Sequence, residues 1–273
     1  MSEAVSFHEF ERRGWATESV TVGYHECFSD ITMQAIGALL DAAEVGPGSR
    51  VLDVATGQGY VAGAAAERGA AAVGMDFSAV QVALAKQRYS AVEFREGDAG
   101  ALPFSDDGFD AVVSNFGMPH FPEPDAFLRE ACRVLRGGGR IAFSAWAQPQ
   151  ECIGFGIIYS AVQRYGEMNV PLPPGPNFFL FGDVAQCERS LQAAGFRSVS
   201  VTKVPQVWRM TSPDAPFEAV MKGSVRAAAL LRAQTPEALA SIRAAIREAA
   251  SAYAHNGVIE LAMPAVVAAA EKP

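Results

Sequence analysis

Between residues 48 and 147, short hydrophobic runs alternate with segments whose hydrophobic positions repeat every three or four residues. The runs are almost continuously apolar, which is typical of parallel strands that are buried on both faces. The segments between them have the period of helices that cover such a sheet. The pattern therefore predicts an α/β fold with a doubly wound, mostly parallel sheet, whose first strands are expected at 50–55, 71–76, 92–98, 109–116 and 139–146.

The predicted helices carry recognisable start and stop signals. Gly69 follows the first helix as a C-terminal stop, and Ser78 precedes the second as a favourable N-cap residue. The third helix, predicted within 123–139, places Phe127 and Leu128 on one face and is expected to stop at its three glycines.

Outside this core the alternation changes. Residues 10–45 look helical, whereas residues 148–182 contain one helix-like piece, a Pro/Gly stretch and an aromatic cluster. Two alanine-rich helices are expected at roughly 214–253, and the last 16 or so residues could supply an edge strand. We expect one domain over 1–273, made of N-terminal helices at 1–47, a binding core at 48–147, a cap insertion at 148–182 and C-terminal helices and strands at 183–273.

Composition narrows the class of partner. The chain has 273 residues and a formal net charge of −8, which disfavours a nucleic-acid backbone as its main partner. The four cysteines show neither a C-x-x-C pair nor metal-like spacing with histidines, so we expect free thiols, no metal and a cytoplasmic location. No signal peptide or membrane-spanning run is recognisable, and a monomer or homodimer is expected.

The loop after the first predicted strand is rich in glycine. Residues 51–62 read VLDVATGQGYVA, in which GQGYVA fits the G-x-G-x-x-G/A dinucleotide fingerprint. The same segment, read from Asp53, also resembles the acidic-x-G-x-G-x-G loop of methyl-donor sites. A P-loop is excluded because no Gly-Lys-Ser/Thr follows. Both remaining interpretations expect an acid at the end of the second strand, about 20 residues on, and Asp76 stands there.

Three further features favour the methyl donor. Asp53 ends the first strand, where its carboxylate would repel a pyrophosphate but suit an ammonium or sulfonium group. Asp98, at the end of the third strand, can accept a hydrogen bond from an adenine amino group, with the Ala99 N–H nearby. A glycine-rich turn precedes the fifth strand.

In this order, the segments resemble the class I S-adenosylmethionine-dependent methyltransferases, specifically the group similar to the ubiquinone/menaquinone-biosynthesis enzymes. The match extends from about residue 40 to 147, and more loosely to 205. Ala55 departs from the family, which commonly has glycine there, although one methyl group adds little bulk. The resemblance implies a seven-stranded Rossmann-like sheet, an N-terminal helical lid and a cap after strand five.

The resemblance also implies an S-adenosylmethionine site at the strand ends. The loop from Ala55 to Gly59 would pack against the methionine part, Asp76 would hold the ribose, and Phe77 would lie beside the adenine. Asn115 and Phe116 would line the methyl-transfer face. The complete expected set is Tyr24, Asp53, Ala55, Thr56, Gly57, Gly59, Asp76, Phe77, Gln81, Asp98, Ala99, Asn115 and Phe116.

Methyl transfer needs alignment more than a catalytic group, since proximity alone can supply roughly 7–11 kcal/mol. Acceptors that lose a proton also benefit from a base. His120, just beyond the fourth strand, is the candidate base, and His25 beside Tyr24 is the second choice.

Aromatic residues in and around 148–182 are placed to wall an apolar pocket. We therefore expect a small, hydrophobic or aromatic acceptor, such as a quinone-like compound or another secondary metabolite, methylated on oxygen or carbon and less favourably on nitrogen. Two alternatives stay open, an NAD(P)-dependent oxidoreductase and a non-catalytic protein that binds S-adenosylmethionine.

Overall fold

The computed structural model describes residues 5–273, which fall into two compact units. Unit 1 comprises the chain up to Ile31, Gln148–Pro174 and Pro205–Pro264. Unit 2 comprises Thr32–Ala147, Gly175–Val204 and Ala265–Pro273. Because each unit is assembled from three segments, neither corresponds to one continuous stretch of the sequence.

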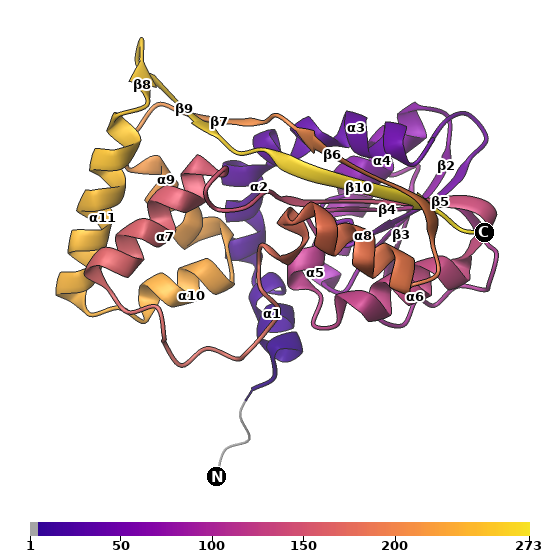
Figure 1. The fold of residues 1–273 in the computed structure, drawn as a ribbon, viewed down its shortest axis with the longest axis horizontal. Coiled ribbons are helices and arrows are strands. Elements are labelled where there is room, and N and C mark those ends of the chain that lie inside the picture. Colours follow the sequence, from indigo (N-terminus) through magenta and orange to yellow (C-terminus); the bar gives the residue numbers. More distant parts are fainter. Residues whose placement is uncertain (1–4) are drawn as a thin grey trace. The chain divides into compact units, whose positions relative to one another are not determined.

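Unit 2 is built on a seven-stranded sheet with the order β3-β2-β1-β4-β5-β10-β6 among the described residues (Figure 1). Strands β1 to β5 are parallel to one another, and β10 is antiparallel to both β5 and β6. This confirms the predicted doubly wound, mostly parallel sheet. The strands are β1 (Arg50–Val54), β2 (Ala71–Asp76), β3 (Glu93–Glu96), β4 (Phe109–Asn115), β5 (Leu135–Trp146), β6 (Arg197–Val204) and β10 (Ala265–Glu271).

Helices cover both faces of this sheet. On one face, α3 (Ile36–Ala42) and α4 (Tyr60–Glu67) pack on β1, β4, β5 and β10 in a cluster that includes Leu39, Val51 and Val113. A neighbouring cluster joins α4 and α5 (Ala79–Arg88) to Phe94 of β3. Helices α6 (Pro124–Val134) and α8 (Val184–Ala193) cover the other face, as the right-handed crossover from β4 to β5 requires (Figure 1).

The predicted helix signals at Ser78 and Gly69 are confirmed. The Ser78 hydroxyl accepts a hydrogen bond from the Gln81 N–H at 3.4 Å and caps α5. Gly69 follows α4 with a φ of 82°, in the left-handed region that favours glycine.

Two boundary predictions are wrong. Helix α6 ends at Val134, and residues 135–139 belong to β5 instead of stopping the helix, with a register shift against β4 between Phe109 and Ala111. The C-terminal strand β10 is not an edge strand, because it pairs on both sides and leaves β6 at the edge. An alanine-rich, fully buried strand has the composition of an inner position.

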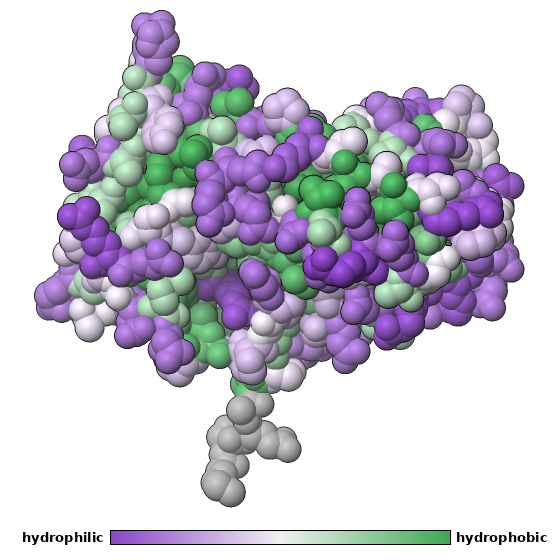
Figure 2. All heavy atoms as spheres, viewed as in Figure 1, coloured by the Kyte–Doolittle hydropathy of each residue, from purple (hydrophilic) through white to green (hydrophobic). Residues whose placement is uncertain are grey.

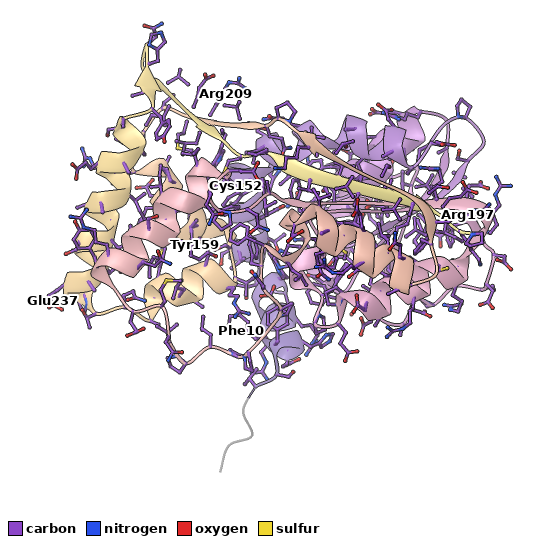
Figure 3. All side chains as sticks on the ribbon, in the orientation of Figure 1. Phe10, Cys152, Tyr159, Arg197, Arg209 and Glu237 are labelled. Atoms are coloured by element: carbon purple, nitrogen blue, oxygen red, sulfur yellow. The ribbon has the colours of Figure 1, made fainter. Side chains whose placement is uncertain are left out.

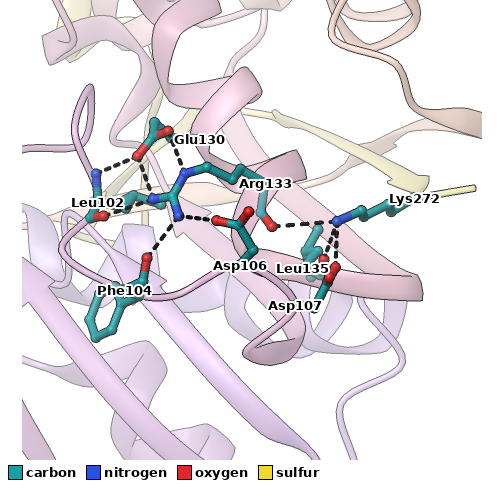
Figure 4. A network of polar contacts seen from close by, with 8 residues as sticks. All are labelled: Leu102, Phe104, Asp106, Asp107, Glu130, Arg133, Leu135 and Lys272. Carbon is teal, nitrogen blue, oxygen red and sulfur yellow. Dashed lines mark hydrogen bonds and ion pairs between the residues drawn. The ribbon is translucent and has the colours of Figure 1, made fainter.

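The loop before β4 is tied to α6 and to the end of the chain (Figure 4). The Arg133 guanidinium donates hydrogen bonds to the Leu102 and Phe104 carbonyls, at 2.9 Å and 2.8 Å. The Lys272 ammonium pairs with Asp107 at 2.8 Å. These contacts lie at the amino end of β4, the end opposite to the predicted site, so they support the sheet.

Unit 1 is mainly helical. Helices α7 and α11 pack against each other, and α9 contacts α7, α10 and α11 (Figure 1). Cys152 precedes α7 and Tyr159 lies on it (Figure 3). Its elements are α1 (Phe7–Trp15), most of α2 (Glu18–Thr32), α7 (Ile153–Tyr165), α9 (Ala215–Gly223), α10 (Arg226–Arg232) and α11 (Pro236–Ser251), with a small sheet of β7 (Val207–Met210), β9 (Val258–Ala262) and β8 (Ala254–His255).

The C-terminal region of unit 1 contains three described helices where the sequence predicts two, because Ser224 and Val225 interrupt the pattern between α9 and α10. Hydrophobic and hydrophilic residues are interspersed on the face shown in Figure 2, in both units. Across residues 5–273, no helix has the length and apolar character needed to cross a membrane.

Candidate active site

The glycine loop follows β1 at the carboxyl edge of the sheet in unit 2. Gly57 and Gly59 both have positive φ angles, 54° and 84°, and Gly59 directly precedes α4. A Cβ built on Gly57 would meet nothing closer than the Gln81 Oε1, at 4.0 Å, so this side of the loop is open. At Gly59, in contrast, a Cβ would lie 2.8 Å from the Phe94 ring. One glycine therefore leaves room for a ligand, and the other allows close packing.

Asp53 lies inside the protein. The residue is 1% exposed, and its Oδ2 accepts hydrogen bonds from the Thr56 hydroxyl at 2.5 Å and the Ala62 N–H at 3.0 Å. Burial raises the pKa of Asp53 to about 7, although both hydrogen bonds act in the opposite direction. These contacts tie the glycine loop to the first turn of α4, so the structure gives Asp53 a role in shaping the loop.

Asp76 lies beside the same loop at the end of β2. Its two carboxylate oxygens accept hydrogen bonds from the Gly57 N–H at 2.9 Å and the Ser78 N–H at 3.0 Å. Each oxygen retains further acceptor capacity for a ligand hydroxyl. Burial raises the pKa of Asp76 to about 6, while these bonds and nearby His120 act to lower it. The group is therefore mostly ionised at neutral pH.

Gln81, on the first turn of α5, supplies a buried polar atom that lacks a partner. Its Oε1 forms no hydrogen bond with the described part of the chain, and it is the atom nearest to the open side of Gly57. A buried acceptor without a donor costs free energy unless a ligand or water satisfies it. An unpartnered acceptor therefore faces the open side of Gly57.

The turn after β4 is held in an unusual backbone conformation. Phe116 has a φ of 57°, and its N–H donates to the Ser144 hydroxyl at 2.9 Å. The same hydroxyl donates to the Asn115 Oδ1 at 2.6 Å, while the Asn115 amide donates to the Thr32 carbonyl at 3.0 Å. The Phe116 ring stacks on Trp146, with centroids 4.1 Å apart. Strained residues fixed in this way cluster at functional sites.

Ser144 is absent from the predicted site, although it holds both Asn115 and Phe116. Nothing in the sequence marks it, because it is one small polar residue within the hydrophobic strand β5. Only the parallel pairing of β4 and β5, which sets Asn115 opposite Ser144, reveals its position.

The remaining predicted residues differ in exposure. Thr56 is buried in the glycine loop, and Phe77 is half-buried after β2. Asp98 lies two residues beyond β3 and is exposed, and its Oδ1 accepts a hydrogen bond from the Gly100 N–H at 2.8 Å. Ala99 beside it is buried.

His120 follows the same β4 turn on a short 3₁₀ helix, η2 (Met118–His120), and is half-buried. Its ring meets the Phe178 ring edge-on, with centroids 6.1 Å apart, and Phe178 in turn contacts Phe179. This contact brings the candidate base and the aromatic cluster together within unit 2.

Tyr24 and His25 lie on α2 in unit 1, not in the unit that contains the glycine loop. The Tyr24 ring stacks with Phe28 at 5.6 Å and meets Trp15 edge-on at 5.3 Å. Its predicted contact with the cofactor remains a prediction.

The unit 2 residues fit the predicted cofactor. The open face of Gly57, the ionised Asp76 and the partnerless Gln81 oxygen provide backbone, anionic and acceptor groups around one loop. Among residues 5–273, His, Cys, Asp and Glu side chains do not form a group that could hold a metal ion.

Comparisons with known proteins agree with this geometry. A methyltransferase domain family model matches residues 52–143. The demethylmenaquinone methyltransferase of Renibacterium salmoninarum is 40% identical over 111 residues, which cover 41% of this chain and 47% of the relative. An uncharacterised protein of Mycobacterium tuberculosis is 35% identical over 160 residues, covering 56% and 57%. The chain thus spans about half the length of these relatives.

A solved structure extends the likeness to the whole fold. Phosphoethanolamine N-methyltransferase 2 of Haemonchus contortus, in complex with phosphomonomethylethanolamine and S-adenosylhomocysteine, has a TM-score of 0.61 at 20% identity, covering 100% of this chain and 61% of that one. At this identity the likeness concerns the fold alone. Together with the family match, it supports the predicted resemblance to the class I S-adenosylmethionine-dependent methyltransferases: residues 52–143 match a methyltransferase domain and are similar to demethylmenaquinone methyltransferases.

Proposed function

We propose that the protein transfers a methyl group from S-adenosylmethionine to a small hydrophobic or aromatic acceptor, with a quinone-like compound as the first candidate. The observation that carries the proposal is the glycine loop beside Asp76, where the Gly57 N–H meets the carboxylate and the opposite side of the loop is open. The quinone-like acceptor is supported by the demethylmenaquinone methyltransferase relatives, which match about two fifths of the chain.

When bound, the cofactor would supply a methyl group on a positively charged sulfur, open to attack by an aligned nucleophile, with S-adenosylhomocysteine as the leaving group. In the proposal, the Gly57 loop binds its amino-acid part, Asp76 accepts hydrogen bonds from the ribose hydroxyls, and Asp98 with Ala99 binds the adenine edge. Phe116 and Asn115, held by Ser144, line the side from which the acceptor approaches. Most of the rate enhancement then comes from alignment, which can supply roughly 7–11 kcal/mol.

His120 accepts the proton that an oxygen or carbon acceptor loses. Its place in the turn after β4 and its contact with Phe178 support this role, because they join a titratable group to an aromatic wall. Phe178 and Phe179 provide the apolar surface that would bind a flat acceptor ring.

The first test is binding and transfer with the full chain. Calorimetry should detect S-adenosylmethionine and S-adenosylhomocysteine but not NAD. Incubation with methyl-labelled cofactor and a panel of naphthoquinols, phenols and amines should label a naphthoquinol or phenol, as read by mass spectrometry of the products. Binding of NAD without the methyl donor would refute the proposal. Cofactor binding without transfer to any panel member would favour a non-catalytic protein.

Asp76→Asn should weaken S-adenosylhomocysteine binding by about 1.5–3 kcal/mol, because it removes a hydrogen bond to a charged group. In the wild-type chain, binding should also weaken as the pH falls through about 6, where Asp76 becomes protonated. Asp125→Asn, at an exposed position on α6, is the matched control and should bind normally. If the folded Asp76→Asn variant binds S-adenosylhomocysteine as tightly as the wild type, Asp76 does not bind the ribose.

His120→Asn should lower kcat by about 10² or more while cofactor affinity is retained, since asparagine can hydrogen-bond but cannot take up the proton. Any pH dependence that the wild-type rate owes to this proton acceptor should be lost in the variant. His255→Asn, exposed on β8, is the control. If His120→Asn lowers kcat by less than about threefold and leaves the pH profile unchanged, methyl transfer depends on alignment and not on a base at His120.

A further inference from the structure

Unit 1 contains a guanidinium group that has no counter-ion among residues 5–273. The Nη1 atom of Arg226, at the start of α10, is buried and has no hydrogen-bond partner in the described chain. None of the ion pairs found among residues 5–273 involves this side chain. A charge taken out of water is costly unless an opposite charge or hydrogen bonds compensate for it. Arg226 as a whole is half-buried, so part of the residue is exposed to solvent.

The neighbouring groups do not neutralise Arg226. Its guanidinium carbon lies 5.5 Å from the centre of the Phe7 ring, which compensates only a fraction of the charge. The charge of Arg226 acts to lower the pKa of the Tyr159 phenol on α7, but burial outweighs it and raises that pKa, so the phenol stays neutral.

Three acids of unit 1 are engaged in other interactions. Glu11 is buried on the same face of α1 as Phe7, one turn away, and its Oε2 accepts a hydrogen bond from the Trp15 indole at 3.0 Å. Asp214 and Glu218 pair with Arg243 at 3.0 Å and 3.3 Å. The sequence of α10, RAAALLR, contains no acid.

The surroundings restrict the anion that can bind. The Phe7 ring beside the guanidinium and Val225, the residue before Arg226, are each less than 10% exposed, so these neighbours present apolar surface. One guanidinium with apolar walls suits a monovalent oxyanion attached to a hydrophobic body, because a phosphate dianion would need more donors to replace its hydration shell. Aromatic side chains on both α1 and α7 favour a flat ring.

We propose that unit 1 has a binding site for a small aromatic carboxylate or phenolate, in which Arg226 donates to the oxyanion beside Phe7 and Tyr159. The site lies within unit 1 and does not depend on the methyl-transfer proposal. Its occupant satisfies the buried Nη1 and supplies the missing counter-charge.

Benzoate is the probe, and benzamide is its uncharged isostere. Without any methyl donor, benzoate should raise the thermal midpoint of the full chain and give a measurable calorimetric affinity, whereas benzamide at the same concentration should not. Chloride at equal ionic strength controls for general salt effects. No benzoate effect, or an equal effect of benzamide, would overturn the proposal.

Arg226→Met keeps a long apolar stem but removes the charge. It should weaken benzoate binding about ten- to a hundredfold, the range for a hydrogen bond to a charged group. Without probe, it should melt no lower than the wild-type chain, because it removes an uncompensated charge. Arg232→Met is the matched control, since Arg232 lies on the same helix but is exposed and bonded to the Met221 carbonyl.

Arg226→Lys keeps the charge without the guanidinium geometry and covers the case in which Arg226→Met does not fold. It should retain weaker, benzoate-selective binding. Undiminished benzoate binding in Arg226→Met, or an equal loss in Arg232→Met, would show that the anion is bound elsewhere. Because these measurements omit S-adenosylmethionine, their failure is distinguishable from failure of the methyl-transfer proposal.

Discussion

At the scale of single residues, the candidate site combines two strained backbone positions. Ala55 and Phe116 both have a φ of 57°, which non-glycine residues rarely adopt. Ala55 follows β1 and Phe116 follows β4, and these strands are neighbours in the sheet. This conformation explains why the methyltransferases that the chain resembles commonly have glycine at the position of Ala55, because glycine adopts it without strain.

Ala55→Gly should therefore stabilise unit 2 by about 0.5–1 kcal/mol, because the relief of left-handed strain exceeds the entropy that glycine loses on folding. Affinity for S-adenosylhomocysteine should change little. Hydrogen exchange of peptides from β1 and β4, measured at several urea concentrations, would give the change in the free energy of unfolding of unit 2. Ala64→Gly, inside the right-handed helix α4, should instead destabilise by about 0.5–1 kcal/mol. A destabilising Ala55→Gly would mean that the Ala55 methyl group contributes packing.

At the scale of helices and strands, periodicity predicts much of unit 2. The strands ending at Asp76 and Asn115, the capped start of α5 and the glycine after α4 are all where the sequence places them. Apolar runs and caps are local signals, so they can be read without knowing which strands pair.

Pairing is not a local signal, and the errors arise from it. The inner position of β10 depends on its partners β5 and β6, which precede it by more than 60 residues. The start of β5 at Leu135 depends on pairing with Phe109, which outweighs the tendency of the glycine run to end a helix and begin a loop. Ser144 cannot be identified from the sequence for the same reason. Its role depends on its hydrogen bond to Asn115, which lies opposite it on the neighbouring strand β4.

At the scale of the whole molecule, the chain passes repeatedly between two units. Residues 148–174, predicted as a cap, belong to unit 1, whereas Phe178 and Phe179 of the same predicted insertion belong to unit 2. Shifts in composition show where the alternation of strands and helices is interrupted, but they do not show to which of the two units each segment belongs. The assignment depends on contacts that join segments far apart in the sequence.

The formal net charge of −8 counts every carboxyl group as ionised, but the titration of two of them depends on folding. Burial raises the pKa of Asp53 to about 7 and that of Asp76 to about 6, from a reference value of 3.8. A carboxyl group with a raised pKa in the folded state binds its proton more tightly there than in the unfolded chain. Its contribution to stability is therefore complete below about pH 4 and is lost as the pH rises through the folded-state value.

Asp53 should dominate this effect, since it is the more strongly shifted group and its Oδ1 has no partner among residues 5–273. Without cofactor, the wild-type free energy of unfolding should decrease between pH 4 and 7, relative to Asp53→Asn, by up to about 1.4 kcal/mol per pH unit. Urea denaturation of unit 2 at several pH values would measure the two slopes, with Asp125→Asn as an exposed control. Parallel pH profiles for the wild type and Asp53→Asn would mean that Asp53 is ionised in the folded protein throughout this range, with its charge stabilised by the Thr56 hydroxyl and the Ala62 N–H despite burial.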